Sequence, residues 1–264
     1  MPTAHLGAVD LYYERAGEGP RLRFISGTGG DLRNKPNMFD GPLGKAFDLL
    51  SYDQRGLGRS AKPDVDFTMA DYADDAAALL DHIGWDRVPV IGVSFGGMVA
   101  QELVLRHPTR VSRLVLACTS PGGAGGASYP FHEIQHLKGE ARARFLMPVS
   151  DTRHDEAWAA ARPDTVAQIL AMSVDRYAGE PGREMGARRQ LEARAQHDAW
   201  ERLADIRCPV LIAGGRYDGI ALPATQERMA GRIPGAQLRF FDGGHMFMIQ
   251  DRTATPAIAE FLKG

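Results

Sequence analysis

The sequence predicts an α/β protein in which a mostly parallel sheet is covered by helices on both faces. Short apolar runs rich in Val, Ile, Leu and Phe recur along the chain and are typical of buried strands. Amphipathic segments with helical spacing follow most of these runs, and such alternation is typical of a parallel sheet. The composition, with 44% hydrophobic and 24% charged residues, is that of an ordinary globular protein.

The first part of the chain supplies four of the expected strands. They span residues 9–17, 21–27, 47–53 and 87–93. A glycine-punctuated loop, QRGLGRS, follows the third strand, and an amphipathic helix closed by Gly84 follows this loop. A second helix is expected from Phe95 to His107-Pro108, because the residue before a proline disfavours helical geometry.

The second part repeats the alternation after an interruption. Further strands are expected at 111–120, 208–215 and 236–244, with helices at 222–233 and 255–264. The interruption divides the chain into a core at 1–121, a helical cap at 122–201 and the rest of the core at 202–264. A glycine-rich hinge at 121–127 opens the cap, and helices are expected near 130–146, 155–177 and 184–200.

The motif with the clearest chemistry lies between a strand and a helix. Ser94 occupies the turn in Gly92-Val93-Ser94-Phe95-Gly96, where a side chain at either glycine would obstruct a sharp reversal. Such a turn exposes the serine at a helix N-terminus, where the helix dipole favours developing negative charge. The motif therefore predicts a nucleophilic serine, and the alternative is a glycine-rich turn without chemistry.

A serine nucleophile needs a base, and His245 is the best candidate among the eight histidines. It follows an apolar strand and two glycines in FFDGGHMF, where a loop can project it over the sheet edge. Three other histidines are expected to be structural. His5 lies in an N-terminal strand, His82 at the end of a helix, and His107 in the His-Pro pair that stops the next helix. The remaining four lie in the cap and are expected on the surface: His132, His136, His154 and His197.

The base needs a carboxylate to orient it, and two aspartates compete for this role. Asp218 follows the strand 208–215, at the edge where the other candidates are expected. Asp242 is only three residues from His245, too close to reach its Nδ1 comfortably, and is expected to shape the loop. The predicted triad is therefore Ser94, Asp218 and His245, in an order that differs from those of other serine-hydrolase folds.

These pieces together resemble the α/β-hydrolase fold-1 family over nearly the whole chain. The matching segments are SYDQRGLGRS, GVSFGG, GGRYDGIA and GGHMF. The resemblance implies an eight-stranded, mostly parallel sheet with helices on both faces and an inserted helical cap. It also implies that Asp53 and Arg55 belong to a structural loop and are not catalytic.

One segment departs from the family pattern. The family usually has His-Gly after its third strand, whereas FISGTGGD has Ser26-Gly27. Because an oxyanion is held by N–H donors, we expect the Thr28 and Phe95 amides to form the oxyanion hole. The 3-oxoadipate enol-lactonases, which this chain resembles, also lack this histidine, and the likeness favours lactones or small esters.

The predicted function is that of a cofactor-free serine hydrolase, a carboxylesterase or lactonase (EC 3.1.1) that cleaves an ester, thioester or lactone through an acyl-enzyme. A serine nucleophile argues against the family's dehalogenase and epoxide-hydrolase branches, which use aspartate. Two alternatives stay open. One is a C–C bond hydrolase of the meta-cleavage type, and the other is a ligand receptor that keeps the triad but barely turns over.

The substrate is expected to be small and largely apolar. Bulky apolar residues are the candidates for its pocket, although each is also compatible with ordinary core: Met98, Tyr129, Met147, Trp158, Met172, Met246 and Phe247. Four arginines of the cap are candidates for binding an acidic substrate, but nearby acids favour a solvated helix face instead: Arg183, Arg188, Arg189 and Arg194.

Charge and cysteine content narrow the possible partners. A net charge of −2 and a pI of about 6.4 give no indication of nucleic acid or an anionic membrane. Cys118 and Cys208 form neither a disulfide framework nor a metal-binding spacing, so both are expected in the core and no metal is expected. Without a signal-peptide core or a membrane-length apolar run, the expectation is a cytoplasmic protein with a small-molecule substrate. A homodimer stays open.

Overall fold

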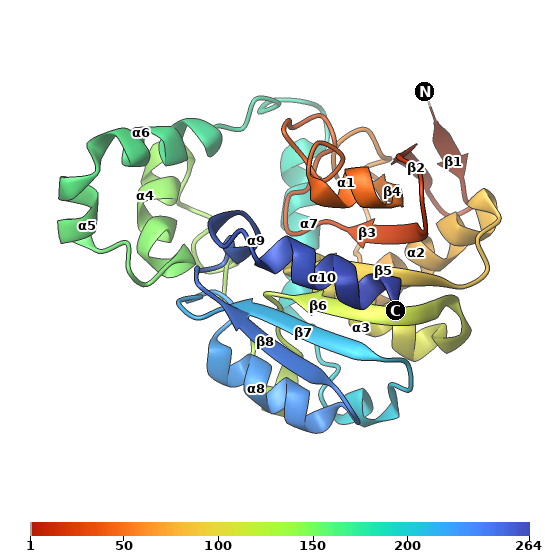
Figure 1. Ribbon diagram of the computed structural model, residues 1–264. Coiled ribbons are helices and arrows are strands. Elements are labelled where there is room, and N and C mark those ends of the chain that lie inside the picture. The colour runs from red at the N-terminus through yellow and green to blue at the C-terminus, as the bar shows by residue number, and fades with distance from the viewer. Residues whose placement is uncertain (1) are drawn as a thin grey trace.

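The computed structural model describes residues 2–264 and is built around one eight-stranded sheet (Figure 1). Its strand order is β1-β2-β4-β3-β5-β6-β7-β8. The strands are β1 (Thr3–His5), β2 (Asp10–Ala16), β3 (Arg21–Ile25), β4 (Asp48–Tyr52), β5 (Val88–Val93), β6 (Val111–Ala117), β7 (Val210–Gly215) and β8 (Gln237–Phe241). The pairs β1–β2 and β2–β4 are antiparallel and the others are parallel, which confirms the predicted fold class.

The central strands are buried on both sides, which explains their continuous apolar sequences. Ile91 of β5 lies opposite Phe24 of β3 on one side and Val115 of β6 on the other. All three side chains are buried in the core. Because the parallel strands end at a common edge, loops from distant parts of the sequence meet there.

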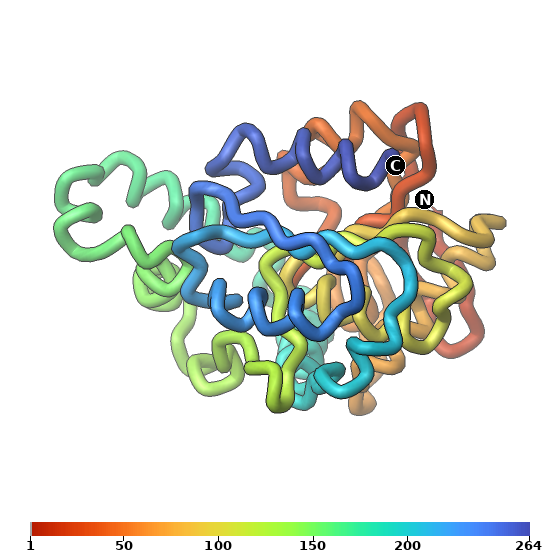
Figure 2. The backbone as a smooth tube through the Cα atoms, turned by 60° about the horizontal axis from the view of Figure 1, so that its bottom comes forward, coloured from red at the N-terminus to blue at the C-terminus, as the bar shows by residue number. Residues whose placement is uncertain are grey.

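Helices cover both faces of the sheet (Figures 1 and 2). One core layer joins the sheet to α1 (Pro42–Ala46), α9 (Phe247–Gln250) and α10 (Ala254–Lys263). The other joins it to α2 (Met69–Ile83), α3 (Phe95–Arg106) and α8 (Pro223–Arg232). No helix within residues 2–264 is long and apolar enough to cross a membrane.

Local signals set the ends of α2 and α3, and the C-terminal end of each is where the sequence predicts it. The Thr68 hydroxyl accepts from the Asp71 amide, and the Asp71 carboxylate accepts from the Thr68 amide, forming a capping box. Gly84 ends α2 with a φ of 71°, a conformation that glycine adopts without strain. His107 precedes Pro108 and ends α3.

The segment between β6 and β7 is helical, but its helices differ from those expected. They are α4 (Gly139–Ser150), α5 (Glu156–Ala161), α6 (Pro163–Met172) and α7 (Arg183–Ala195). The helix expected over 155–177 is interrupted because Arg162, which precedes Pro163, leaves helical geometry at φ −137° and ψ 56°. The first helix begins later than predicted because residues 130–138 form turns and no α-helix.

The helices between β6 and β7 lie in two different places. Helices α4, α5 and α6 project together to one side of the sheet, as the green segments of Figures 1 and 2 show. Helix α7 returns to the core, where Gly186 packs so closely on Gly56 that a Cβ would lie 1.9 Å from the Gly56 carbonyl oxygen. The glycine-rich entry at 121–127 is an ordered turn, in which the Pro121 carbonyl accepts from the Ala199 amide at 2.8 Å.

His197 lies in the core, so its predicted surface position is wrong. It follows α7, and its Nε2 lies 3.4 Å from the Gln101 Oε1 atom. The chain folds this polar segment back against α3, which the local sequence pattern does not reveal. Burial lowers the pKa of His197 from 6.5 to about 4.

We expect this buried histidine to make the protein sensitive to acid. As the pH falls from 6.5 to about 4, the unfolded chain protonates His197 while the folded chain does not. The free energy of unfolding should therefore fall by up to about 1.4 kcal/mol per pH unit from this group. Urea unfolding of His197→Gln across this range should show a shallower pH dependence than the unmodified protein. The exposed His136→Gln variant is the control, and an equal slope in all three proteins would contradict the expectation.

Candidate active site

Ser94 lies at the turn between β5 and α3 in a strained backbone conformation. Its φ is 55° and its ψ is −116°, and such a positive φ is costly for a residue other than glycine. A Cβ at Gly92 would lie 2.2 Å from the Gly96 carbonyl oxygen, and one at Gly96 would lie 2.2 Å from the Ile25 carbonyl oxygen. Both flanking glycines are therefore needed, and the turn holds the serine at the first turn of α3.

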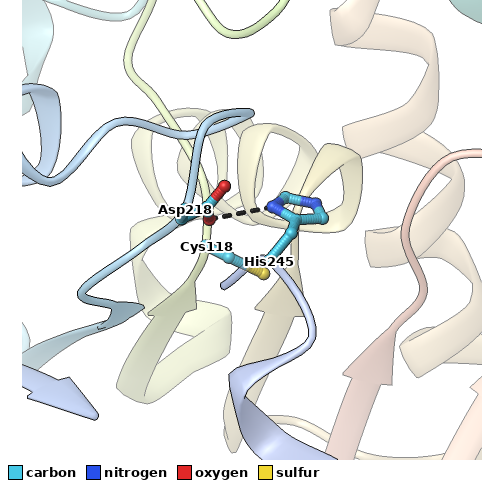
Figure 3. Close-up of side chains that lie close together, drawn as sticks. All are labelled: Cys118, Asp218 and His245. Carbon is cyan, nitrogen blue, oxygen red and sulfur yellow. Dashed lines mark hydrogen bonds and ion pairs between the residues drawn. The ribbon is translucent and has the colours of Figure 1, made fainter. Parts of the chain in front are cut away.

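The structure brings the three predicted triad residues together at the carboxyl edge of the sheet. The Nε2 atom of His245 lies 3.0 Å from the Ser94 Oγ, and its Nδ1 lies 2.9 Å from the Asp218 Oδ2. Figure 3 shows the second of these contacts. Ser94 follows β5, Asp218 follows β7 and His245 follows β8, so three separate strands position the set.

Asp218 is fixed by its own loop. Its Oδ1 atom accepts from the amides of Ile220 at 2.8 Å and Ala221 at 2.9 Å. The residue is only 1% exposed. These amides satisfy one carboxylate oxygen and leave the other directed at His245, which is the orientation a general base requires.

Asp242, the competing carboxylate, points elsewhere. Its side chain is 71% exposed and its Oδ1 accepts from the Arg153 Nη1 at 3.0 Å. The structure thus gives His245 one buried carboxylate partner and places the other aspartate on the surface.

The end of α4 contributes to the position of His245. The His245 amide donates to the Ser150 carbonyl, at the end of α4, over 2.6 Å. A Cβ at Gly244 would lie 2.2 Å from the same carbonyl oxygen, so only glycine fits before the histidine. This contact between α4 and the histidine loop is not apparent from the sequence, because the two segments are about a hundred residues apart.

The loop after β3 borders Ser94. A Cβ at Gly27 would lie 3.4 Å from the Ser94 Cβ, which places the Thr28 backbone beside the serine. Within residues 2–264 the Thr28 amide donates to no acceptor, and Phe95 is the first residue of α3, where amides lack helical partners. The Ser26 carbonyl accepts from Gln54 Nε2 at 2.8 Å, so Ser26 is engaged with the neighbouring loop.

Cys118 directly follows β6 and lies beside the acid–base pair. The Cys118 Sγ, a carboxylate oxygen of Asp218 and a ring nitrogen of His245 all lie within 4.8 Å of one another (Figure 3). Burial raises the pKa of the Cys118 thiol well above its ordinary value, whereas metal binding requires a thiolate. Since His245 and Asp218 are already hydrogen-bonded, the set fits an acid–base pair better than a metal centre.

Asp53 and Arg55 hold loops together. Asp53 accepts from the amides of Leu32 at 2.7 Å and Arg59 at 2.8 Å. Burial raises the pKa of Asp53 to about 6. Arg55 makes a bidentate ion pair with Asp75, with both distances at 2.7 Å. These contacts fit the scaffold role expected for both residues.

The predicted pocket residues are scattered. Met98 packs in the main core, and Phe247 is fully buried with its ring 5.4 Å from that of Phe241. Met172 is 74% exposed at the end of α6, and Met246 is also exposed. Trp158 lies in α5, and its ring stacks on the ring of His154, which precedes this helix. The contacts of these five residues lie in the core or on the surface, and their place in a substrate pocket stays a prediction.

A different apolar cluster adjoins the Asp218 loop. Its buried members are Phe131, Ile134, Leu191 and Ile220, and the half-buried Tyr129 packs against them. Ile220 belongs to the same turn as Asp218, so the cluster borders the triad. Leu146 and Val149 of α4 also pack against this cluster. Met147, which lies between them in the sequence, is buried as well. Only Tyr129 of the cluster is among the predicted lining residues.

The chain belongs to the α/β-hydrolase family, because the family model described as "alpha/beta hydrolase fold" matches residues 20–251. It is 30% identical to "Putative carbamate hydrolase RutD" of Caulobacter vibrioides, with all of both chains covered. It is 29% identical to a poly(3-hydroxyalkanoate) depolymerase of Ectopseudomonas oleovorans, over 82% of this chain and 75% of the depolymerase. The structure of the enol-lactonase from Burkholderia xenovorans LB400 superposes with a TM-score of 0.81 and 26% identity, covering all of both chains.

Proposed function

We propose that this α/β hydrolase is a serine enzyme that cleaves a carboxylic ester, thioester or lactone through an acyl-enzyme. The observation that supports this proposal is the hydrogen-bonded series from Ser94 through His245 to Asp218. The three relatives also act, by their names, on lactone, polyester and carbamate groups, all of which contain an acyl carbon open to attack.

In the proposed mechanism His245 Nε2 takes the proton from Ser94 Oγ as this oxygen attacks the carbonyl carbon. The Thr28 and Phe95 amides stabilise the oxyanion that forms, and Asp218 stabilises the imidazolium. His245 then gives its proton to the departing alkoxide, thiolate or lactone ring oxygen. Water hydrolyses the acyl-enzyme in a second cycle, in which His245 again serves as the base and Ser94 recovers its proton.

A fluorophosphonate probe should test the nucleophile without knowledge of the substrate. Its phosphorus forms a bond to the activated serine oxygen as fluoride leaves, so we expect one label per chain, on the peptide that contains Ser94. Intact-protein and peptide mass spectrometry measure both points. A label on another residue, or none under conditions that modify a known serine esterase, would contradict the proposal.

A substrate panel should then define the reaction. Matched esters, thioesters, lactones and carbamates, together with a vinylogous dienone, are compared by kcat/KM. We expect the ester or lactone arm to be fastest. Preferential cleavage of the dienone would indicate C–C hydrolysis, and ligand binding with turnover below one per minute on every arm would indicate a receptor.

A further inference from the structure

Helix α7 carries four arginines, and one of them differs from the rest. Three have carboxylate partners: Arg183 with Asp31 and Asp175, Arg188 with Glu192, and Arg189 with Asp66 and Glu192. Arg194 is only 7% exposed, and no carboxylate in residues 2–264 lies within ion-pair distance of it. The expectation of a solvated, acid-balanced face is therefore wrong for Arg194.

The partners of Arg194 are neutral. Its Nη1 donates to the Thr28 Oγ1 at 2.8 Å, its Nη2 donates to the Ser128 Oγ, and its guanidinium lies 4.3 Å from the centre of the Phe131 ring. Burial lowers the pKa of Arg194 to about 10, so the side chain is still a cation at neutral pH. A buried charge without a counter-ion is costly, because hydroxyls and a ring offset it only in part.

A second cation approaches the same ring. Arg142 of α4 lies 5.6 Å from the centre of the Phe131 ring and donates to the Ile134 carbonyl at 3.0 Å. It is half-buried, and burial lowers the pKa of its guanidinium too. Among the described residues it also has no carboxylate partner. Two guanidinium groups therefore lie against the apolar cluster around Phe131 without a carboxylate of residues 2–264 in direct contact, although the charge of the nearby Asp218 acts on Arg194 and partly offsets its own.

Arg194 lies between the two loops that border the triad. Thr28, which accepts from it, directly follows Gly27, where an added Cβ would be 3.4 Å from the Ser94 Cβ. Ser128, its other partner, donates to the carbonyl of Ile220, whose amide in turn donates to Asp218. The guanidinium therefore contacts the loop of Thr28 directly, and it reaches the loop of Asp218 through the Ser128 side chain.

We propose that Arg194, assisted by Arg142, binds a carboxylate on the substrate, so that the substrate is an ester or lactone with a free carboxylate at the end of a short apolar spacer. A guanidinium has five N–H donors, of which Thr28 and Ser128 use two, so donors are left for a carboxylate. The apolar cluster would contact the spacer. This inference rests on the serine hydrolase function proposed above and adds the class of substrate.

The test compares two esters of equal shape and different charge. Ethyl hydrogen succinate carries a carboxylate where ethyl 4-methylpentanoate carries an isopropyl group, and ethanol release measures both reactions. We expect the unmodified protein to prefer the anionic ester by at least tenfold in kcat/KM. Arg194→Met should lower kcat/KM for the anionic ester by roughly 10- to 100-fold and change that for the neutral ester by less than fivefold.

Arg188→Met is the matched control, because Arg188 lies on the same helix with its side chain 53% exposed and should affect neither ester. A second measurement does not depend on how the variant folds. In the unmodified protein succinate should inhibit hydrolysis of the neutral ester competitively, and succinamide should be at least tenfold weaker.

The outcomes separate this inference from the proposed function. Equal losses on both esters in Arg194→Met, or no preference for the anionic ester together with equal inhibition by succinate and succinamide, would overturn the carboxylate site. In that case the fluorophosphonate label on Ser94 and turnover of neutral esters would still stand. Loss of the Ser94 label itself would instead overturn the hydrolase proposal.

Discussion

Replacing Ser94 with alanine should lower kcat by about 10⁴- to 10⁶-fold, the usual cost of losing a triad nucleophile. The substitution removes only the Oγ atom that lies 3.0 Å from His245 Nε2. Alanine has the same backbone preferences at φ 55° as serine, so the turn should keep its geometry. Steady-state kinetics on the best substrate of the panel, with circular dichroism and thermal unfolding, measure the two effects separately.

Ser173→Ala provides the matched control for Ser94→Ala. Ser173 is the C-cap residue of α6, and its hydroxyl donates to the Ile169 carbonyl of the same helix at 2.8 Å. In the described part of the chain it makes no hydrogen bond to the residues around Ser94. We expect its kcat to stay within twofold of the unmodified protein. Residual turnover within tenfold of normal in folded Ser94→Ala would show that another residue is the nucleophile.

Much of the fold could be predicted from the sequence because its central strands are buried on both faces. Continuous apolar runs such as that of β5 carry this signal without any knowledge of their neighbours. The convergence of Ser94, Asp218 and His245 could also be anticipated, since each lies in the loop or turn after a strand and parallel strands share one carboxyl edge. Position along the chain is enough to bring these three together.

Features that depend on packing between distant segments could not be predicted in this way. Arg194 looks like its neighbours in an arginine-rich helix, and only its contacts with Ser128 and Thr28, 66 and 166 residues away, reveal that it is buried. The burial of His197 escapes prediction for the same reason, because its partner Gln101 is 96 residues away. Size and apolarity suggest pocket residues, but those properties do not distinguish a core residue such as Phe247 from one that lines a cavity.

Asp218→Asn should lower kcat by about 10⁴-fold while the fold is kept. The asparagine carbonyl can still accept from the Ile220 and Ala221 amides, which leaves its NH₂ group facing His245 Nδ1. An NH₂ group donates and cannot accept, so Nδ1 must become the acceptor and the imidazole proton moves to Nε2. The nitrogen facing Ser94 then has no lone pair for the serine proton, and general-base catalysis is lost.

Asp242→Asn makes the same chemical change three residues from His245 and is the decisive control. Its carboxylate is exposed and contacts Arg153, so its loss should leave kcat within twofold and alter only the surface. The two variants are compared by kcat and by thermal unfolding at the same pH. If Asp242→Asn lost activity and folded Asp218→Asn kept it, the histidine would be oriented by Asp242, and the buried contact at 2.9 Å would be structural. We expect the opposite, because a carboxylate that orients a general base must be held in place, and only Asp218 has two backbone amides that hold it.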